Sequence, residues 1–333
     1  MGASSRSWVS DVTGATWTDP DRPLSPGEDR ATLRALEAVT RNRDRVIAVE
    51  NIVSVAFDLV SFSAIMVLMV TGLGVIASMM GVFNFAHGEF LLLGAYTVYL
   101  THSHGYPVWA GMVVAPFAVA LVGLALERGV IRFFYAEPVV AMLGTYAIGL
   151  VIRESVRGLI GGLYHSVPDP LIGSFSLGAV QLSRWRCVII LVTAIVIAVF
   201  WFVLTRTGLG LTIRASLENP ALARASGIST NRVYALTFAV GAGLAGLAGG
   251  LMVPIFSMFA DLGVRFLIQG FLAVLLGGVG SFEGPALGAA VIGVLSAGLP
   301  WVLSPVLADV LVFVIAIVIV KFRPAGLLST QRS

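Results

Sequence analysis

Long apolar blocks separated by short polar segments run through the chain from Ile52 to Phe322. A helix needs about 20 mainly apolar residues to cross a bilayer, and these blocks have that length. The pattern predicts about eight or nine transmembrane or re-entrant helices. Their expected bounds are roughly 52–70, 73–101, 108–126, 138–156, 186–204, 233–253, 266–281, 285–302 and 305–321. Glycine and polar residues interrupt 73–101 and 266–281, which favours a broken or re-entrant helix in both.

Residues 1–50 are different, because they contain seven arginines, eight acidic residues and three prolines but no apolar block. Such composition predicts disorder in the first half, whereas 28–50 is rich in helix formers and predicts a surface helix. The segment lacks the apolar core of a signal peptide, so we expect it to stay attached, as a variable tail or an adaptor. The expected organisation is an N-terminal extension over 1–50, a transmembrane domain over 51–328 and a short tail over 329–333.

Composition supports a membrane protein. Hydrophobic residues make up 57 % of the chain, charged residues 12 %, and the mean hydropathy is +0.94, whereas about a quarter of the residues in soluble domains are charged. The fold class expected is therefore an all-α polytopic membrane protein. The net charge of +3 comes from arginines beside the spans, a topology signal that does not predict a nucleic-acid partner. The lone Cys187 cannot form an internal disulfide, and we expect it to pack as a small hydrophobe.

Arginine placement predicts the orientation of the chain. The central polar segment, 205–232, holds four arginines against the single acid Glu218, and such an excess is typical of cytoplasmic loops. The segment 158–183 contains neither Lys nor Arg, which suits the outer face. Lys321 and Arg323 follow the last block, so the C-terminus is expected in the cytoplasm. The side on which the N-terminus lies depends on the span count and stays open.

The central segment also predicts a short helix. Asn219 followed by Pro220 is typical of an N-cap and a first helical residue, and Gly227 is typical of a C-terminal stop. About two turns of helix do not persist alone in water, so this helix needs a surface to pack against. That surface belongs either to the chain's own membrane helices or to a cytoplasmic partner.

Polar residues inside apolar blocks are the candidates for a solute path. The stretch GVFNFAHGEFLLLGAY places Asn84, His87 and Glu89 in a hydrophobic context. An ionisable group at membrane depth costs on the order of 3 kcal/mol, so Glu89 either lines a path or is a structural acid, with Asn84 and His87 close enough to be its partners. Asp58 and Glu283 raise the same question, whereas Asp309, near a span end, is expected to cap or snorkel.

Other features support packing or transport. Thr145 and Tyr146, in LGTYAIG, are hydrogen-bond donors that could serve a passing solute or an ordinary helix. Small residues four apart, at 242, 246 and 250 and at 284 and 288, allow close helix packing. The similarity between 81–95 and 277–290 suggests related halves, as in internally repeated transporters.

Absent motifs exclude several activities. The only lysine is Lys321, so no phosphate-binding G-x-x-x-x-G-K-[ST] loop exists in the chain. Nor does the sequence contain H-E-x-x-H, a spaced Cys/His metal cluster or an arginine ladder within a span. We therefore expect no enzyme activity, cofactor or metal in this chain. A carrier or channel remains, with energy supplied by ions or by another subunit.

Three motifs together resemble a known family. MMGVFNFAHGEFLLLGAY, IRASLENPALARASGISTNRVYALTFAVGAGLAGLAGGL and FLAVLLGGVGSFEGPALGAAVIG followed by FRPAGLL are similar to permeases of ATP-binding cassette importers for branched-chain amino acids, urea and short-chain amides. The resemblance covers roughly 52–328. It implies an all-helical permease in the bacterial cytoplasmic membrane. Its implied partners are a second, related permease, two cytoplasmic ATPase subunits that hold ATP and Mg²⁺, and an extracytoplasmic solute-binding protein.

The resemblance also implies a role for the central segment as a coupling helix in which 219–227 inserts into a groove of the ATPase. The residues implied in coupling are Arg214, Glu218, Asn219, Pro220, Leu222, Ala225 and Gly227. The segment GTYAIGLVIRESVRGLIGG, which contains Arg153 and Glu154, resembles the urea and amide members of the family more than the amino acid members.

The hypothesis is a permease subunit of an importer for small neutral polar solutes. Two alternatives stay open. One is a standalone proton-coupled carrier that uses Glu89, His87 and Asp58, and the other is a passive urea or amide channel. The tentative path residues under the main hypothesis are Asn84, His87, Glu89, Thr145, Tyr146 and Glu283.

Overall fold

A computed structural model describes residues 26–81, 83–135, 137–177, 180–278, 283–323 and 326–327. The expected disorder before residue 26 and the expected tail over 329–333 lie outside these residues. The chain divides into two compact units, one of residues 1–54 with 176–181 and one of residues 55–175 with 182–333. The second unit is the helical bundle that positions the site.

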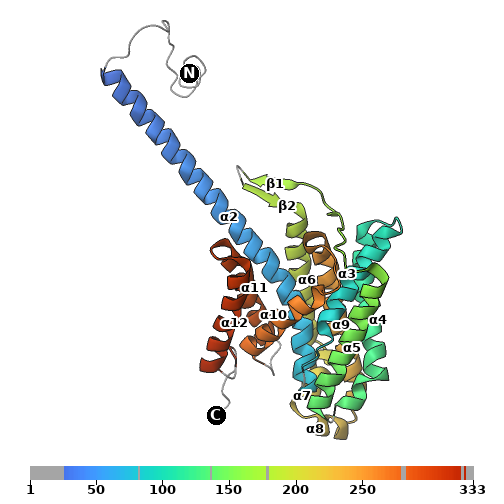
Figure 1. Ribbon diagram of the computed structural model, residues 1–333. Coiled ribbons are helices and arrows are strands. Elements are labelled where there is room, and N and C mark those ends of the chain that lie inside the picture. The colour runs from blue at the N-terminus through green and yellow to red at the C-terminus, as the bar shows by residue number, and fades with distance from the viewer. Residues whose placement is uncertain are drawn as a thin grey trace. The chain divides into compact units, whose positions relative to one another are not determined.

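Helices make up most of the described chain (Figure 1). The long ones are α2 (Pro26–Met80), α3 (His87–Ser103), α4 (Val108–Gly129), α5 (Pro138–Ile160), α6 (Arg184–Arg206), α9 (Thr230–Phe256), α10 (Leu262–Gly277), α11 (Glu283–Gly298) and α12 (Pro305–Phe322). The short elements are η1 (Ile131–Phe134), α7 (Gly208–Glu218), α8 (Pro220–Ala225), η2 (Leu299–Trp301) and the paired strands β1 (Ser174–Leu177) and β2 (Val180–Ser183). The all-α polytopic fold is confirmed.

Seven helices within the described residues are long and apolar enough to span a membrane. They cover Asn51–Ser78, Val108–Gly129, Pro138–Ile160, Arg184–Arg206, Thr230–Phe256, Glu283–Trp301 and Pro305–Phe322. At about 1.5 Å per residue, α3 and α10 extend only about 25 Å, less than the roughly 30 Å hydrocarbon core. The interruptions expected in these two regions therefore correspond to short helices.

One predicted boundary is wrong. The sequence suggested that a span ends near residue 70 and another begins at 73, but α2 continues without a break to Met80. Gly72 is a contact point, because a Cβ built there would lie 2.5 Å from the carbonyl oxygen of Gly241. The real break follows α2, where Gly81 has a φ of 65°, in the left-handed region that favours glycine.

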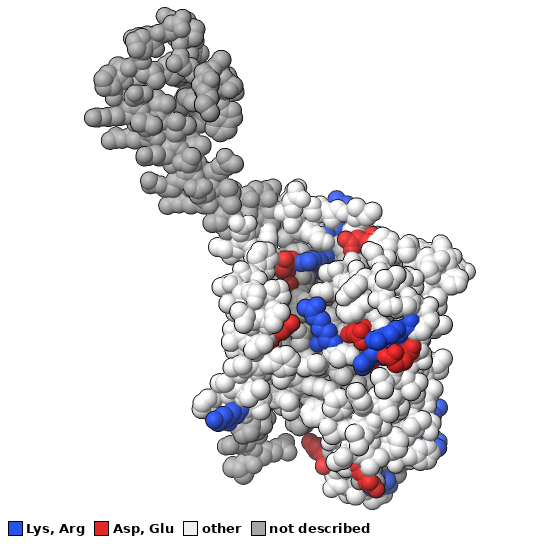
Figure 2. All heavy atoms as spheres, viewed as in Figure 1, with Lys and Arg blue, Asp and Glu red and all other residues white. Residues whose placement is uncertain are grey.

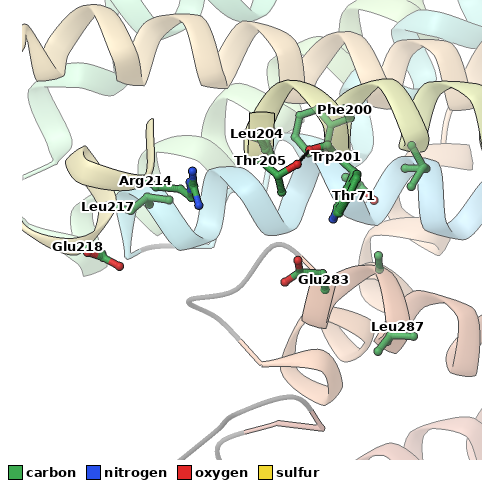
Figure 3. Close-up of a pocket in the computed structure, with 12 residues that line it drawn as sticks. Thr71, Phe200, Trp201, Leu204, Thr205, Arg214, Leu217, Glu218, Glu283 and Leu287 are labelled. Carbon is green, nitrogen blue, oxygen red and sulfur yellow. Dashed lines mark hydrogen bonds between the residues drawn. The ribbon is translucent and has the colours of Figure 1, made fainter. Parts of the chain in front are cut away.

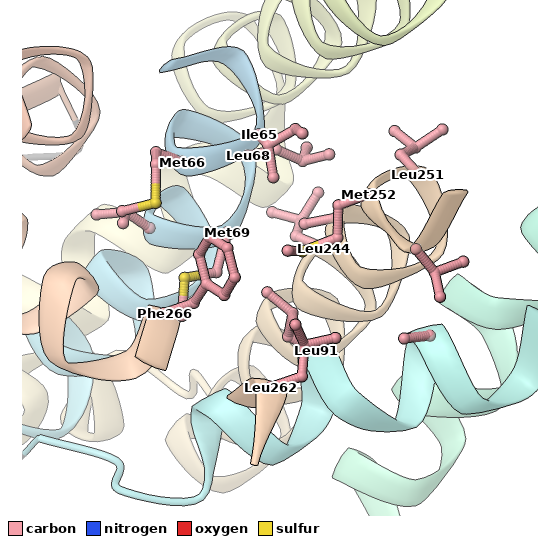
Figure 4. Packing of buried hydrophobic residues seen from close by; sticks show 14 of the residues in the cluster. Ile65, Met66, Leu68, Met69, Leu91, Leu244, Leu251, Met252, Leu262 and Phe266 are labelled. Carbon is pink, nitrogen blue, oxygen red and sulfur yellow. The ribbon is translucent and has the colours of Figure 1, made fainter. Parts of the chain in front are cut away.

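The core is built on direct backbone contact between helices. A Cβ at Gly94 on α3 would lie 2.0 Å from the carbonyl oxygen of Gly246 on α9, and one at Gly249 would lie 1.9 Å from that of Leu91. Small residues allow this approach in a membrane, where no hydrophobic effect drives helices together. Large side chains from α2, α3, α9 and α10, among them Met69 and Phe266, fill the space around these contacts (Figure 4).

Candidate functional site

A cluster of buried polar side chains surrounds the break between α2 and α3. We call Asn84, His87, Glu89, Thr145 and Arg153 the buried polar cluster. The first four side chains are almost completely inaccessible to solvent, and Arg153 is only 15 % exposed. Two of its residues come from α3, two from α5 and one from the break itself.

Side chains of the cluster form hydrogen bonds with backbone groups of the break and of α2. The Thr145 hydroxyl accepts a hydrogen bond from the Phe85 amide at 3.1 Å, and the Asn84 side-chain oxygen accepts one from the Ala86 amide at 3.0 Å. The His87 ring nitrogen Nε2 lies 3.1 Å from the Met69 carbonyl oxygen. Irregular backbone at membrane depth requires such partners, so these residues hold the break in one conformation.

Glu89 pairs with Arg153 across two helices. The guanidinium donates to the same carboxylate oxygen, Oε1, from Nε at 3.0 Å and from Nη2 at 2.5 Å. The partners that the sequence suggested, Asn84 and His87, bond to backbone groups instead. Residues two apart on a helix do not face one another, so His87 and Glu89 point to different neighbours.

Three polar atoms of the cluster have no hydrogen-bond partner among the described residues. They are Nδ2 of Asn84, Nδ1 of His87 and Oε2 of Glu89. Buried polar atoms of native proteins are almost always bonded to protein or to ordered water. The cluster therefore offers spare donors and acceptors to water or to a small polar solute.

Two expected path residues lie apart from the cluster. Tyr146 follows Thr145 but is 53 % exposed, because consecutive helical residues point about 100° apart. Glu283 begins α11 and is exposed. Asp58 on α2 pairs with Arg186 on α6, and Asp309 lies half-buried in the second turn of α12.

The central polar segment forms two helices. The Asn219 side-chain oxygen accepts from the Leu222 amide at 2.9 Å, Pro220 is the first residue of α8, and Gly227 has a φ of 83°. This confirms the predicted helix and both of its boundaries. The preceding helix, α7, was not predicted. The spacing of Leu209, Ile213 and Leu217, four residues apart after Thr207, is the signal that could have found it.

Most of the surface of α8 is exposed. Ala223 is buried and faces the chain's own helices, whereas Leu222 is 63 % exposed and Arg224 and Ala225 are exposed. One face of the helix thus meets the bundle, and its other face presents an apolar side chain and a cation to the surroundings.

A cavity of about 460 Å³ is lined by residues for which the sequence suggested separate roles. Arg214 and Glu218 on α7 line it together with Glu283 on α11, Thr71 on α2 and Trp201 on α6. Figure 3 shows Glu283 across the cavity from the α6 and α7 side chains. The structure therefore brings Glu283 to the α7 end of the bundle and away from the buried polar cluster.

Three further polar contacts were missed by the sequence reasoning. The Tyr135 hydroxyl donates a hydrogen bond to the buried Glu127 carboxylate at 2.6 Å. Burial of the Tyr135 side chain is the main cause that raises its pKa above the ordinary value, and this hydrogen bond raises it further. Arg157 pairs with Asp261 at 2.6 Å and with Glu154 at 3.6 Å. Figure 2 shows that charged side chains on the visible face gather in a few mixed groups on an otherwise uncharged surface.

Helices long and apolar enough to span a membrane make this a polytopic membrane protein, and its buried polar cluster at a helix break is a candidate solute or ion site. Residues 55–320 match the family model described as the branched-chain amino acid transport system / permease component. The match covers most of the chain, and the protein belongs to this family.

Curated relatives agree with that assignment. The chain is 28 % identical over 278 residues to the high-affinity branched-chain amino acid transport system permease protein BraD of Pseudomonas aeruginosa, covering 78 % of this chain and 90 % of the relative. It is 25 % identical over 288 residues to LivH of Salmonella typhimurium, with 82 % and 94 % covered. A probable branched-chain amino acid permease of Methanocaldococcus jannaschii is 28 % identical over 247 residues, with 70 % and 76 % covered.

Proposed function

We propose that this chain is a permease subunit of an ATP-driven importer in the bacterial cytoplasmic membrane, and that α8 is the helix through which ATPase subunits drive it. Branched-chain amino acids are the preferred solutes because the similar permeases above are named for them, with urea and short amides as the alternative. The proposed partners are a second related permease, two ATPase subunits that hold ATP and Mg²⁺, and an extracytoplasmic solute-binding protein.

The observation that carries this proposal is the exposed, capped helix α8. Asn219 and Gly227 define its two ends, so a six-residue helix keeps its shape while most of its surface is free. Leu222 exposes an apolar side chain and Arg224 a charge, a combination typical of interface residues. Under this proposal α8 and the C-terminus lie in the cytoplasm, in agreement with the arginines at 206, 214, 224 and 232.

The packing supplies a route from α8 to the buried polar cluster. Helix α9 begins a few residues after α8, at Thr230. It packs backbone to backbone against α3 at Gly94 and Gly246, and the first turn of α3 contains Glu89. Helices in such close contact move together, so displacement of α8 would move the element that bears the cluster.

The ion pairs weigh against a proton-coupled carrier. Glu89 and Asp58 are the acids that such a carrier would protonate and deprotonate, and both pair with arginine. An arginine stays charged at any physiological pH and forms charge-assisted hydrogen bonds with its carboxylate partner. Proton cycling at either acid would therefore have to break an ion pair in each turnover.

Uptake measured in vesicles tests the proposal. With the ATPase and binding-protein partners present, leucine should accumulate against its gradient only when ATP is supplied. Accumulation driven by a proton gradient without ATPase subunits would show a secondary carrier, and flux that equilibrates without ATP would show a channel.

Ala225→Arg tests the docking role of α8. This change places a long cation on the exposed face of α8 and should abolish ATPase co-purification and uptake while the permease remains inserted. Tyr106→Arg, an exposed residue in the turn between α3 and α4, is the control and should leave co-purification unchanged. Normal co-purification and uptake with Ala225→Arg would contradict the docking role.

A further inference from the structure

A second, smaller cavity lies at the N-terminal end of α6, the end that is farther along the chain from α7. It has a volume of about 160 Å³. Its walls come from α2, α6, α9, α11 and η2, and its polar lining includes Asp58 and Arg186. All of its lining residues belong to the same compact unit.

One wall of the cavity is an ion pair that still has a hydrogen-bond donor and a hydrogen-bond acceptor without partners among the described residues. Nη1 of Arg186 donates to Oδ1 of Asp58, and the two side chains remain 30 % and 36 % exposed. An ionised carboxylate has a second acceptor oxygen, and a guanidinium has five N–H donors in a planar fork. Among the described residues, no hydrogen bond engages Oδ2 of Asp58 or Nη2 of Arg186. A free anionic acceptor and a free cationic donor thus lie side by side.

The rest of the lining is mainly apolar. Phe62 and Phe256 meet edge to face, with ring centroids 5.9 Å apart, and Ile65, which also lines the cavity, is buried. Ile255 and Trp301 complete the lining. A cavity of about 150 Å³ with apolar walls holds a benzene molecule, so this one has room for an aliphatic group of four or five carbon atoms, by the same rough comparison.

We propose that this cavity is a binding subsite for a free zwitterionic amino acid with a branched aliphatic side chain. The carboxylate of the solute pairs with Arg186, its ammonium group pairs with Asp58, and its side chain packs against the two phenylalanine rings. Urea and short amides have no charged groups to match this pair, so the subsite selects amino acids over them. The inference rests on the proposed function and names the residues that would recognise its solute.

A photoactivatable leucine analogue with a diazirine in its side chain keeps both charged groups and is a direct probe. In the purified importer with its partner subunits, light should attach it to cavity residues such as Phe62, Phe256 or Trp301, as mapped by mass spectrometry. Excess leucine should suppress the labelling. 4-Methylpentanoate, which lacks the ammonium group, and isopentylamine, which lacks the carboxylate, should compete at least tenfold less well.

Variants separate recognition from a structural ion pair. Asp58→Asn should lower labelling at least tenfold and weaken the discrimination against 4-methylpentanoate. The double exchange D58R/R186D keeps an ion pair but reverses its direction relative to the apolar wall, so it should retain assembly and thermal stability and still lose labelling. Asp261→Asn, which breaks another exposed pair, is the matched control and should label normally. Full labelling in the double exchange would overturn the proposal.

The outcomes distinguish this inference from the proposed function. Leucine uptake driven by ATP without labelling of the cavity would overturn the subsite and leave the importer intact. Labelling that leucine suppresses, in a protein that shows no ATP-driven uptake, would overturn the importer and leave the subsite intact. The absence of both would overturn both.

Discussion

The helix α8 and the buried polar cluster are both built from polar residues of an apolar chain, but they are held in different ways. Helix α8 is held by its own neighbours in sequence, since Asn219 caps Leu222 three residues away. The cluster is held by distant ones, since Arg153 reaches Glu89 across 64 positions of the chain. Most of the surface of α8 is exposed, whereas the side chains of the cluster are largely buried.

This difference teaches where each region derives its stability. A cap contributes about 1 kcal/mol, and its loss is felt locally. A buried charge that loses its partner keeps its full desolvation cost, which lowers the free energy of unfolding of the whole protein. Changes in the cluster should therefore affect global unfolding, whereas changes in α8 should affect local order and partner binding.

The largest effect is expected for Arg153→Leu. This change leaves the Glu89 carboxylate buried without its partner, and we expect the free energy of unfolding to fall by about 3–5 kcal/mol. Thermal unfolding of the purified protein in detergent measures it. Adding Glu89→Gln removes the unpaired charge and should restore more than half of the loss. Equal stability of the single variant and the native protein would show that the cluster does not support the fold.

A smaller effect is expected for Gly249→Ala, because a Cβ there would lie 1.9 Å from the Leu91 carbonyl oxygen. Forcing α3 and α9 apart should cost about 1–3 kcal/mol in the free energy of unfolding. Gly208→Ala, at the start of α7, is the matched control, because a Cβ at that position meets nothing within 4 Å. If the two variants melt at the same temperature, close packing of α3 on α9 is not the source of stability.

Asn219→Ala should cost about 1 kcal/mol, felt only in α8. The amide of Leu222 loses the oxygen that accepts its hydrogen bond, so hydrogen exchange at 221–225 should accelerate by about fivefold, the equivalent of 1 kcal/mol. The melting temperature of the bundle should stay within error. Asn231→Ala, exposed in the first turn of α9, is the control. Slowed or unchanged exchange in α8 would contradict the capping role.

The smallest effect is expected for Tyr146→Phe. The side chain is mostly exposed, and surface substitutions of this kind usually change the free energy of unfolding by less than about 0.5 kcal/mol. Uptake should also stay unchanged, since Tyr146 lies outside the cluster that its neighbour Thr145 joins. Reduced uptake with normal stability would place Tyr146 on the solute path or on a contact with a partner.

The two regions also differ in how well the sequence predicted them. Periodicity and composition were sufficient for the membrane helices, and the Asn219–Pro220 start with the Gly227 stop was sufficient for α8, because caps and stops act within one turn of the chain. The break expected near residue 70 is absent because the glycines there provide helix contacts, Gly72 with Gly241 on α9 and Gly74 with Pro285 on α11. Local sequence does not distinguish a glycine that ends a helix from one that lets another helix approach.

The sequence by itself determined that the chain crosses a membrane, where most of the long apolar helices lie and where the exposed helix begins and ends. Only the tertiary structure decided that Arg153 is the partner of Glu89, that Asp58 meets Arg186, and that Glu283 lines a cavity together with Arg214. Helix periodicity follows from neighbours a few residues apart. An ion pair between helices depends on how whole helices pack, and that arrangement is set by contacts between residues far apart in the chain.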